Sequence, residues 1–152
     1  MSTRPQRPRR SAMYVPAINA RAVEKSRTLD MDSVIYDLED AVAPDMKATA
    51  RAQLVAAFDA GGFGHRETVI RINAADTADY LPDLDTVARC RPQAVLVPKV
   101  SSPADLVDLA QRCAAAGLGE GFGLWAMVVL LGLQVFRGEQ TLEKLGKVAE
   151  LV

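Results

Sequence analysis

Short apolar segments alternate with segments of helical pattern along almost the whole chain. The apolar segments, each bounded by turn residues, predict strands at residues 11–15, 33–38, 68–72, 94–97 and from 124 onward. Repeated strand–helix units of this kind form a parallel sheet with right-handed crossovers. Two α/β architectures fit: an open doubly wound sheet or a (β/α)₈ TIM barrel.

The length of the chain limits the second architecture. The chain has 152 residues, whereas a complete (β/α)₈ barrel needs about 250. It holds about five strand–helix units. We therefore expect either an open sheet or a partial barrel.

The predicted helices carry recognisable start signals. Asn19 can cap the first helix, and Asp45 opens the second. Ser102 can cap the fourth, with Pro103 at its first helical position. In the second helix, the residues expected near one apolar face are Ala48, Ala52, Val55, Ala56 and Phe58.

The composition is that of an ordinary soluble chain. With 49% hydrophobic residues and a formal net charge of −1, it fits neither extended disorder nor chain-wide nucleic-acid binding. Its longest apolar run, residues 124–136, is shorter than the roughly 20 residues of a membrane span. Two cysteines, Cys90 and Cys113, are too few for a disulfide framework, and we interpret both as reduced thiols of a cytoplasmic protein.

The first ten residues carry four arginines and no acidic residue. We expect residues 1–10 to form a flexible basic arm, with a phosphate-contacting arm as the alternative. A transit peptide fits less well, because Pro5 and Pro8 would interrupt the amphipathic helix that it needs.

Charged residues follow three of the predicted strands, at the ends where parallel α/β folds bind ligands. Asp37, Glu39 and Asp40 come at the end of the second strand. Three carboxylates this close repel one another unless a cation is near. Arg71 near the end of the third strand and Lys99 after the fourth belong to the same rim. Such a rim suits an anionic substrate, with or without a metal ion.

The same rim also allows a purely structural interpretation. In that case Asp37 or Glu39 only forms an ion pair with Arg71 or caps the helix that follows. Asn73, two residues after Arg71, is expected to face the same way as Arg71.

The glycine-rich loop and the single histidine are weaker candidates. The sequence GLGEGFG at residues 117–123 follows a helix and opens a strand, whereas a phosphate cradle follows a strand and opens a helix. We therefore expect this loop at the end of the sheet opposite the rim. His65 lies in an equivalent connection and is predicted to be a surface residue.

Several motifs occur together in a familiar order. They are SAMYVPA, VIYDLEDAVAPDMKATAR, VIRIN, AVLVPKVSSPADL and LWAM, between Arg10 and Met127. This pattern resembles the citrate lyase beta-subunit family, in the wider HpcH/HpaI aldolase/citrate lyase group of (β/α)₈ TIM barrels. The resemblance implies a partial barrel over residues 11–127, after the basic arm and before an atypical tail over residues 128–152.

The resemblance also implies a function. Such enzymes are carbon–carbon lyases acting on a 3-hydroxy-acid thioester, such as a citryl or malyl ester of coenzyme A or of a carrier. Magnesium coordinates the acid portion of the substrate. The family's catalytic and substrate-binding arginine carries over to Arg71, and its acidic cluster beside the metal to Asp37, Glu39 and Asp40. Lys99 matches the family's lysine after the fourth strand.

One departure from the family bears on catalysis. Where the family reads LWAMIET, with a metal-binding Glu, this chain has Val129, and no aspartate follows Asp108 to serve as the second metal ligand. Magnesium requires oxygen ligands. We therefore expect the family's metal site to be absent and turnover to be impaired.

The tail and the partial barrel leave other interpretations open. Residues 140–152 predict an amphipathic packing helix, and residues 128–136 match nothing in the family, as a truncation, a fusion or a frameshift would leave them. A partial barrel exposes strand edges, so a non-catalytic binding or assembly module is the alternative function. Its partner would be another copy or a complementing barrel half. A degenerate gene product that does not fold stably is the third possibility.

Overall fold

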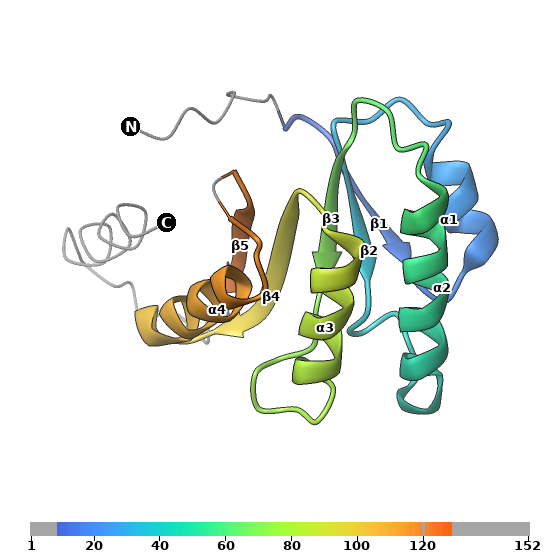
Figure 1. Ribbon diagram of the computed structural model, residues 1–152. Coiled ribbons are helices and arrows are strands. Elements are labelled where there is room, and N and C mark those ends of the chain that lie inside the picture. Colours follow the sequence, from blue (N-terminus) through green and yellow to red (C-terminus); the bar gives the residue numbers. More distant parts are fainter. Residues whose placement is uncertain (1–8, 120, 129–152) are drawn as a thin grey trace, which may run out of the picture.

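The computed structural model describes residues 9–119 and 121–128, and these form a curled parallel sheet covered by helices (Figure 1). The predictions for Val129 and for a helix over residues 140–152 lie outside the described residues. In chain order the elements are β1 (Ala12–Pro16), α1 (Ala20–Ser26), β2 (Ser33–Asp37), a 3₁₀ turn (Pro44–Met46), α2 (Lys47–Ala60), β3 (Glu67–Arg71), α3 (Tyr80–Cys90), β4 (Ala94–Val100), α4 (Pro103–Ala115) and β5 (Gly123–Val128).

The strand order decides between the two predicted architectures. The strands pair in the sequential order β1-β2-β3-β4-β5, and every pair is parallel. The four helices in the described part of the chain contribute to one core on the same face of the sheet, through Val23, Leu54, Val87 and Leu109. A doubly wound sheet would reverse its strand order and carry helices on both faces. The described residues therefore form part of a (β/α) barrel that is not closed.

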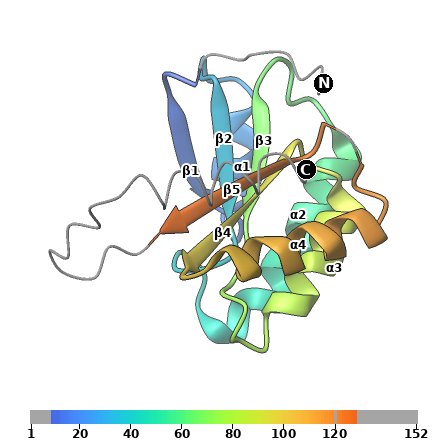
Figure 2. The ribbon, with the colours of Figure 1, turned by 90° about the vertical axis from the view of Figure 1, so that its left-hand side faces the viewer.

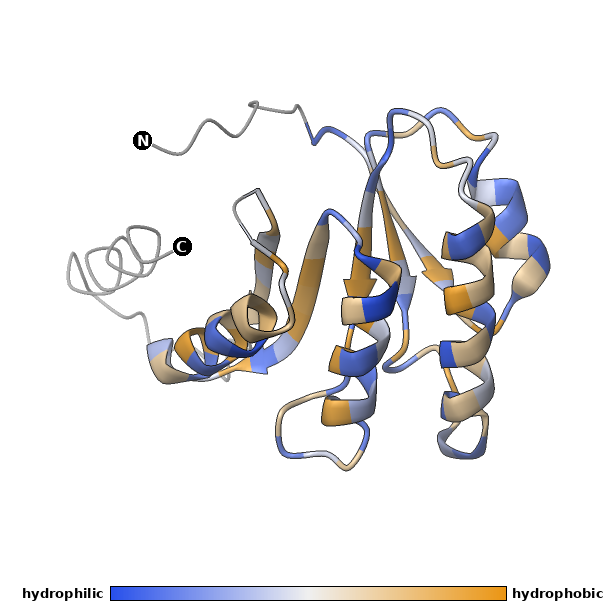
Figure 3. Cartoon of the chain, in the orientation of Figure 1, coloured by the Kyte–Doolittle hydropathy of each residue, from blue (hydrophilic) through white to orange (hydrophobic). Residues whose placement is uncertain are grey.

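The two faces of the sheet bury different sets of side chains. Val34 and Tyr36 of β2 pack toward the helices, whereas Ile35 between them packs on the opposite, concave face. The concave face has its own small cluster, made of Ile35, Val69, Ala94 and Leu96 with Trp125 packed against it. Burial on both faces explains why β2, β3 and β4 carry apolar residues in their central parts, as Figure 3 shows.

The sheet curls so far that side chains of its first and last strands contact each other across the concave face, although the two strands do not pair. Tyr14 Oη of β1 donates to Met127 Sδ of β5 over 3.6 Å, although these residues are 113 positions apart in the sequence. The guanidinium of Arg9 lies over the Trp125 ring, 5.3 Å from its centroid. Figure 2 shows β5 crossing in front of the earlier strands.

The predicted end of the fourth strand at Pro98 is wrong. β4 continues to Val100, and its register with β5 shifts between Val97 and Val100. Its pairing with β3 ends at Leu96. Pro98 therefore lies in an irregular stretch, where proline's missing N–H costs no regular ladder bond.

The predicted start of the second helix is also wrong, and its predicted apolar face is confirmed only for Val55 and Phe58, which pack on the core. α2 begins at Lys47, because Asp45 lies in the preceding 3₁₀ turn. The alanines expected on the buried face, Ala48, Ala52 and Ala56, are exposed, whereas the buried apolar residues are Ala50, Leu54 and Val55. Alanine has too little apolar area to set the orientation of a helix, so the larger side chains decide it.

Other local predictions are confirmed. α4 begins at Pro103 after Ser102, whose N–H donates to the Asp105 carboxylate over 2.9 Å. The glycine-rich loop lies at the amino end of the sheet, because Gly123 pairs with Ala94, the first residue of β4. The His65 side chain is 65% exposed.

Among the described helices, none is long and apolar enough to cross a bilayer.

Candidate functional site

Arg71 at the end of β3 binds the carboxylate at the end of β2. Asp37 and Arg71 are register partners in the two strands. Nε and Nη2 of Arg71 donate to Oδ1 and Oδ2 of Asp37 over 2.7 and 2.6 Å. This two-point geometry fixes the plane of the guanidinium. The guanidinium carbon of Arg71 also lies over the Tyr14 ring, 5.1 Å from its centroid.

The Asp37 carboxylate also orders the loop that follows β2. Its Oδ1 accepts from the Glu39 N–H over 2.8 Å, and its Oδ2 accepts from the Ala41 N–H over 3.1 Å. Burial alone would raise the pKa of Asp37, but the bonds from Arg71 and from these N–H groups outweigh it, so its pKa lies below the usual range. Asp37 is thus held ionised and fully bonded.

Glu39 and Asp40 share the remaining guanidinium nitrogen. Arg71 Nη1 lies 3.0 Å from Glu39 Oε2 and 3.3 Å from Asp40 Oδ2. The Glu39 side chain is buried, whereas that of Asp40 is 76% exposed. Burial raises the pKa of Glu39 more than the charges of Arg71 and Lys99 lower it, and the charge of Asp40 adds to the rise.

Lys99 completes the rim from β4. Its Nζ lies 3.5 Å from Glu39 Oε1, and its side chain is 62% exposed. Its backbone has φ 54°, in the left-handed region that residues with a Cβ seldom adopt. A left-handed backbone is strained for a residue with a Cβ, and such strained conformations are found mainly at ligand sites and turns.

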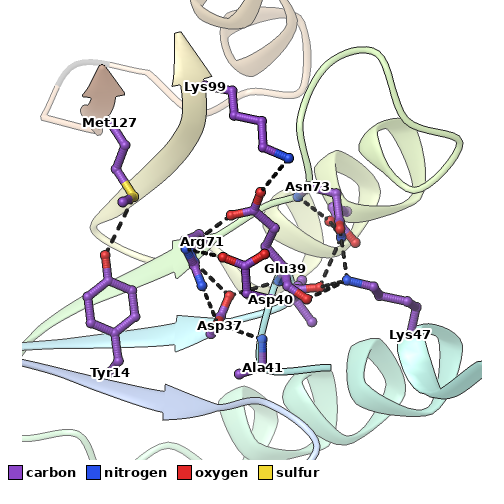
Figure 4. A network of polar contacts seen from close by, with 12 residues as sticks. Tyr14, Asp37, Glu39, Asp40, Ala41, Lys47, Arg71, Asn73, Lys99 and Met127 are labelled. Carbon is purple, nitrogen blue, oxygen red and sulfur yellow. Dashed lines mark hydrogen bonds and ion pairs between the residues drawn. The ribbon is translucent and has the colours of Figure 1, made fainter. Parts of the chain in front are cut away.

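The structure brings the five predicted rim residues together at the carboxyl ends of the strands (Figure 4). They are Asp37, Glu39, Asp40, Arg71 and Lys99. The ion pair between Asp37 and Arg71, which the structural interpretation predicted, is present as well. Three carboxylates face two cations, so the cluster carries an excess of negative charge when all five groups are ionised.

The prediction for Asn73 is wrong. Its side chain does not join Arg71 but contacts Lys47 of α2 and Asp83 of α3, on the helix side of the sheet. β3 ends at Arg71, so the alternation of strand side chains does not extend to Asn73.

Comparison with known proteins gives the family. A model described as HpcH/HpaI aldolase/citrate lyase matches residues 10–142. The chain belongs to this family. The match continues past Met127, where the resemblance read from the motifs ended.

Named relatives align with most of this chain. The (3S)-malyl-CoA thioesterase of Cereibacter sphaeroides is 42% identical over 121 residues, covering 80% of this chain and 40% of the relative. The citrate lyase subunit beta of Haemophilus influenzae is 38% identical over 101 residues, covering 66% of this chain and 35% of the relative. The chain therefore spans about two fifths, or less, of these curated relatives.

A solved structure of this family confirms the predicted fold. The CitE protein of Mycobacterium tuberculosis, in complex with magnesium and acetate, superposes with a TM-score of 0.61 and 33% identity. The similarity covers 77% of this chain and 43% of that protein. The family's TIM-barrel fold is thus represented here by five parallel strands within the described residues.

The rim carboxylates do not fit a magnesium ion as they are arranged. Both oxygens of Asp37 are bonded to Arg71 and to backbone N–H groups, and Glu39 lies between Arg71 and Lys99. Among the described residues, no group of three or more His, Cys, Asp or Glu side chains is arranged to hold a metal ion. The buried carboxylates Asp37 and Glu39 have the oxygen ligands that magnesium prefers, but these oxygens already contact cations and N–H groups of the chain itself.

The sequence interpretation missed a polar group behind the rim. Lys47, at the start of α2, is buried and bonds backbone carbonyls of the loop after β2. A signal was present in the segment DMKATAR, where Lys47 and Arg51 are four residues apart and so share one face of a helix. Tyr14, whose ring lies against Arg71, was also missed.

Proposed function

We propose that the rim binds the carboxylated end of a short 3-hydroxy-acyl thioester, a citryl or malyl ester of coenzyme A or of a carrier. The observation that carries this proposal is the placement of Arg71. Its guanidinium is held at the carboxyl ends of the strands by Asp37, in the fold where family members act on such esters. The names of the relatives, a malyl-CoA thioesterase and a citrate lyase subunit, support the same substrate class.

A substrate carboxylate has a defined place to enter. Asp40 makes the longest of the three contacts with Arg71, and it is exposed to water. An incoming carboxylate can therefore replace Asp40 on Arg71 Nη1 at lower cost than it could replace Asp37. Asp37 keeps the guanidinium in place during this exchange, because its own two bonds to Arg71 are shorter and buried.

The proposed reaction is a retro-aldol cleavage. The substrate hydroxyl loses its proton and becomes a carbonyl, the neighbouring carbon–carbon bond breaks, and its electron pair passes into the enolate of the acetyl thioester, which then takes up a proton. Malyl-CoA would give glyoxylate and acetyl-CoA, and citryl-CoA would give oxaloacetate and acetyl-CoA. Arg71 would hold the acid and offset the developing negative charge.

We expect this chain to perform the reaction poorly. Val129 stands where the family's motif has its metal-binding Glu, and a valine side chain has no oxygen to offer. Binding of the thioester and its turnover are therefore separable in this protein. Binding depends on Arg71 and its neighbours, whereas turnover depends also on groups that this sequence does not supply at that position.

The test is an assay of the purified chain with malyl-CoA or citryl-CoA and magnesium, with products identified by mass spectrometry. We expect titration calorimetry to show binding that is lost in Arg71→Met and kept in the exposed control Arg89→Met. We expect only traces of acetyl-CoA and oxo acid. Free coenzyme A with intact malate would show a thioesterase instead, and fast cleavage would contradict the expected impairment.

A non-catalytic assembly module is the second candidate. Within the described residues, β1 and β5 each have only one partner strand. Between them the concave face leaves Tyr14 46% and Met127 39% exposed. Another copy, or a separate chain that completes the barrel, would cover these edges. Size-exclusion chromatography with light scattering tests this, and a monomer at all concentrations, with no complementing chain bound, would contradict it.

A further inference from the structure

A buried ammonium lies directly behind the rim. Lys47 Nζ donates to the carbonyl oxygens of Leu38 and Glu39 over 2.7 and 2.6 Å, and to Asn73 Oδ1 over 2.8 Å. An ammonium has three N–H donors, so all of them are used. Lys47 is only 7% exposed. It is therefore not free for chemistry of its own, and its bonds are directed at the backbone of the loop that carries Glu39 and Asp40 (Figure 4).

The position of this lysine is not explained by the helix that carries it. Lys47 is the first residue of α2, and helix N-termini favour negative rather than positive side chains. Burying an ammonium is also costly unless it is fully bonded. Both costs are offset here by the two loop carbonyls and by Asn73, so the lysine is placed to serve the loop rather than the helix.

Further polar residues hold Lys47 and its partner in place. Asn73 Nδ2 donates to the Leu38 carbonyl over 3.0 Å and to Asp83 Oδ2 over 2.7 Å. Asp83 is fully buried, and its Oδ1 accepts from Arg51 over 3.0 Å. Arg51 also donates to Asp79 over 2.9 Å. The network thus ties α2 and α3 to the loop after β2.

We infer that Lys47 is a positioning residue that clamps the loop after β2 and so aims Glu39 and Asp40 at Arg71. The loop is held from two sides. On the concave side the Asp37 carboxylate accepts from N–H groups of the loop, and on the helix side Lys47 binds its carbonyls. Its effect on ligand binding rests on the proposed function, whereas its effect on the loop does not.

The test compares Lys47→Met, which keeps an unbranched side chain that is one atom shorter and uncharged, with the exposed control Lys25→Met. We expect amide hydrogen exchange at Glu39 and Ala41 to become about tenfold faster or more in Lys47→Met, because bonds of a buried charged group are lost. The amide of Val69 in β3 should exchange as before. A loss of global stability would instead accelerate all three amides together.

The second readout is the dissociation constant for malyl-CoA in the presence of magnesium, measured by titration calorimetry on the full chain. We expect about a tenfold rise in Lys47→Met, since small displacements of a binding group are costly, and no rise in Lys25→Met. If amide exchange in the loop of Lys47→Met becomes faster but the dissociation constant for malyl-CoA does not change, the inference is overturned. If wild type does not bind malyl-CoA, the proposed function fails, and the exchange result alone decides the role of Lys47.

A milder variant keeps the inference testable if Lys47→Met does not unfold cooperatively. Asn73→Ala leaves the ammonium in place but removes one of its acceptors and one donor to the Leu38 carbonyl. We expect a smaller acceleration at Glu39 and Ala41 in this variant. Unchanged exchange at both amides would overturn the inference.

Discussion

Asp37 and Arg71 stand opposite each other on neighbouring parallel strands and are joined by two hydrogen bonds of 2.6 and 2.7 Å. Their side chains are 2% and 10% exposed. Because the strands are parallel and in register, residues at their carboxyl ends meet without any contribution from a loop. The pair therefore anchors the rim to the sheet itself, and the loop residues Glu39 and Asp40 arrange themselves around it.

Removing Arg71 should destabilise the protein strongly. Arg71→Met leaves the buried Asp37 without its cationic partner, and we expect the free energy of unfolding to fall by about 3 kcal/mol. Urea denaturation measures the loss, and the exposed control Arg89→Met should change stability by less than about 0.5 kcal/mol. The double variant Arg71→Met/Asp37→Asn should recover part of the loss. Equal effects of Arg71→Met and Arg89→Met would contradict the prediction.

The stability of Glu39→Gln relative to wild type should depend on pH. Burial raises the pKa of Glu39, so the folded protein binds this proton more tightly than the unfolded chain does. This tighter proton binding stabilises wild type fully below the usual Glu pKa of about 4.3. The stabilisation is lost as pH rises through the raised pKa of Glu39. Glu39→Gln should therefore gain stability relative to wild type between about pH 4 and pH 7.

Urea denaturation over this pH range measures the difference. Asp85→Asn, at an exposed position on α3, is the control and should show no comparable gain. The quantity to follow is the free energy of unfolding of Glu39→Gln minus that of wild type. If this difference stays constant or falls as pH rises, the folded protein does not favour protonated Glu39.

The left-handed backbone at Lys99 should favour glycine over alanine. Lys99→Gly and Lys99→Ala both remove the contact with Glu39, so their difference isolates the backbone at φ 54°. We expect Lys99→Gly to be more stable by about 1 kcal/mol in thermal or urea unfolding. The same pair at Lys25, inside α1, should show the opposite order, because alanine is the better helix former.

Both cysteines should be unreactive in the folded protein. Burial raises the pKa of Cys90 to about 12, with the charge of Asp59 adding to the rise, and burial raises that of Cys113 to about 11. At pH 8 fewer than about one thiol in a thousand is then ionised, and the thiolate is the reacting form. With 5,5′-dithiobis(2-nitrobenzoic acid), we expect slow reaction of native protein and rapid reaction of both thiols in urea. Rapid stoichiometric reaction before unfolding would contradict this.

Some features of the site follow from the order of residues alone. Asp37, Arg71 and Lys99 could be assigned to one rim because each comes at the end of an apolar strand, and parallel strands end at one edge of the sheet. Asn73 could not be placed in this way. It lies beyond the last residue of β3, where the alternation of faces stops, and its partners come from two different helices.

The sequence by itself determined the α/β class, the parallel sense of the strands and the location of the charged rim, because the alternation of apolar strand segments with helical segments is encoded locally. Only the tertiary structure decided which partners these charges have. Arg71 is shared among three carboxylates, Lys47 reaches the loop from behind, and Tyr14 meets Met127 across the curled sheet. Each of these contacts depends on how helices and distant strands pack, and packing brings together residues whose separation along the chain carries no local pattern.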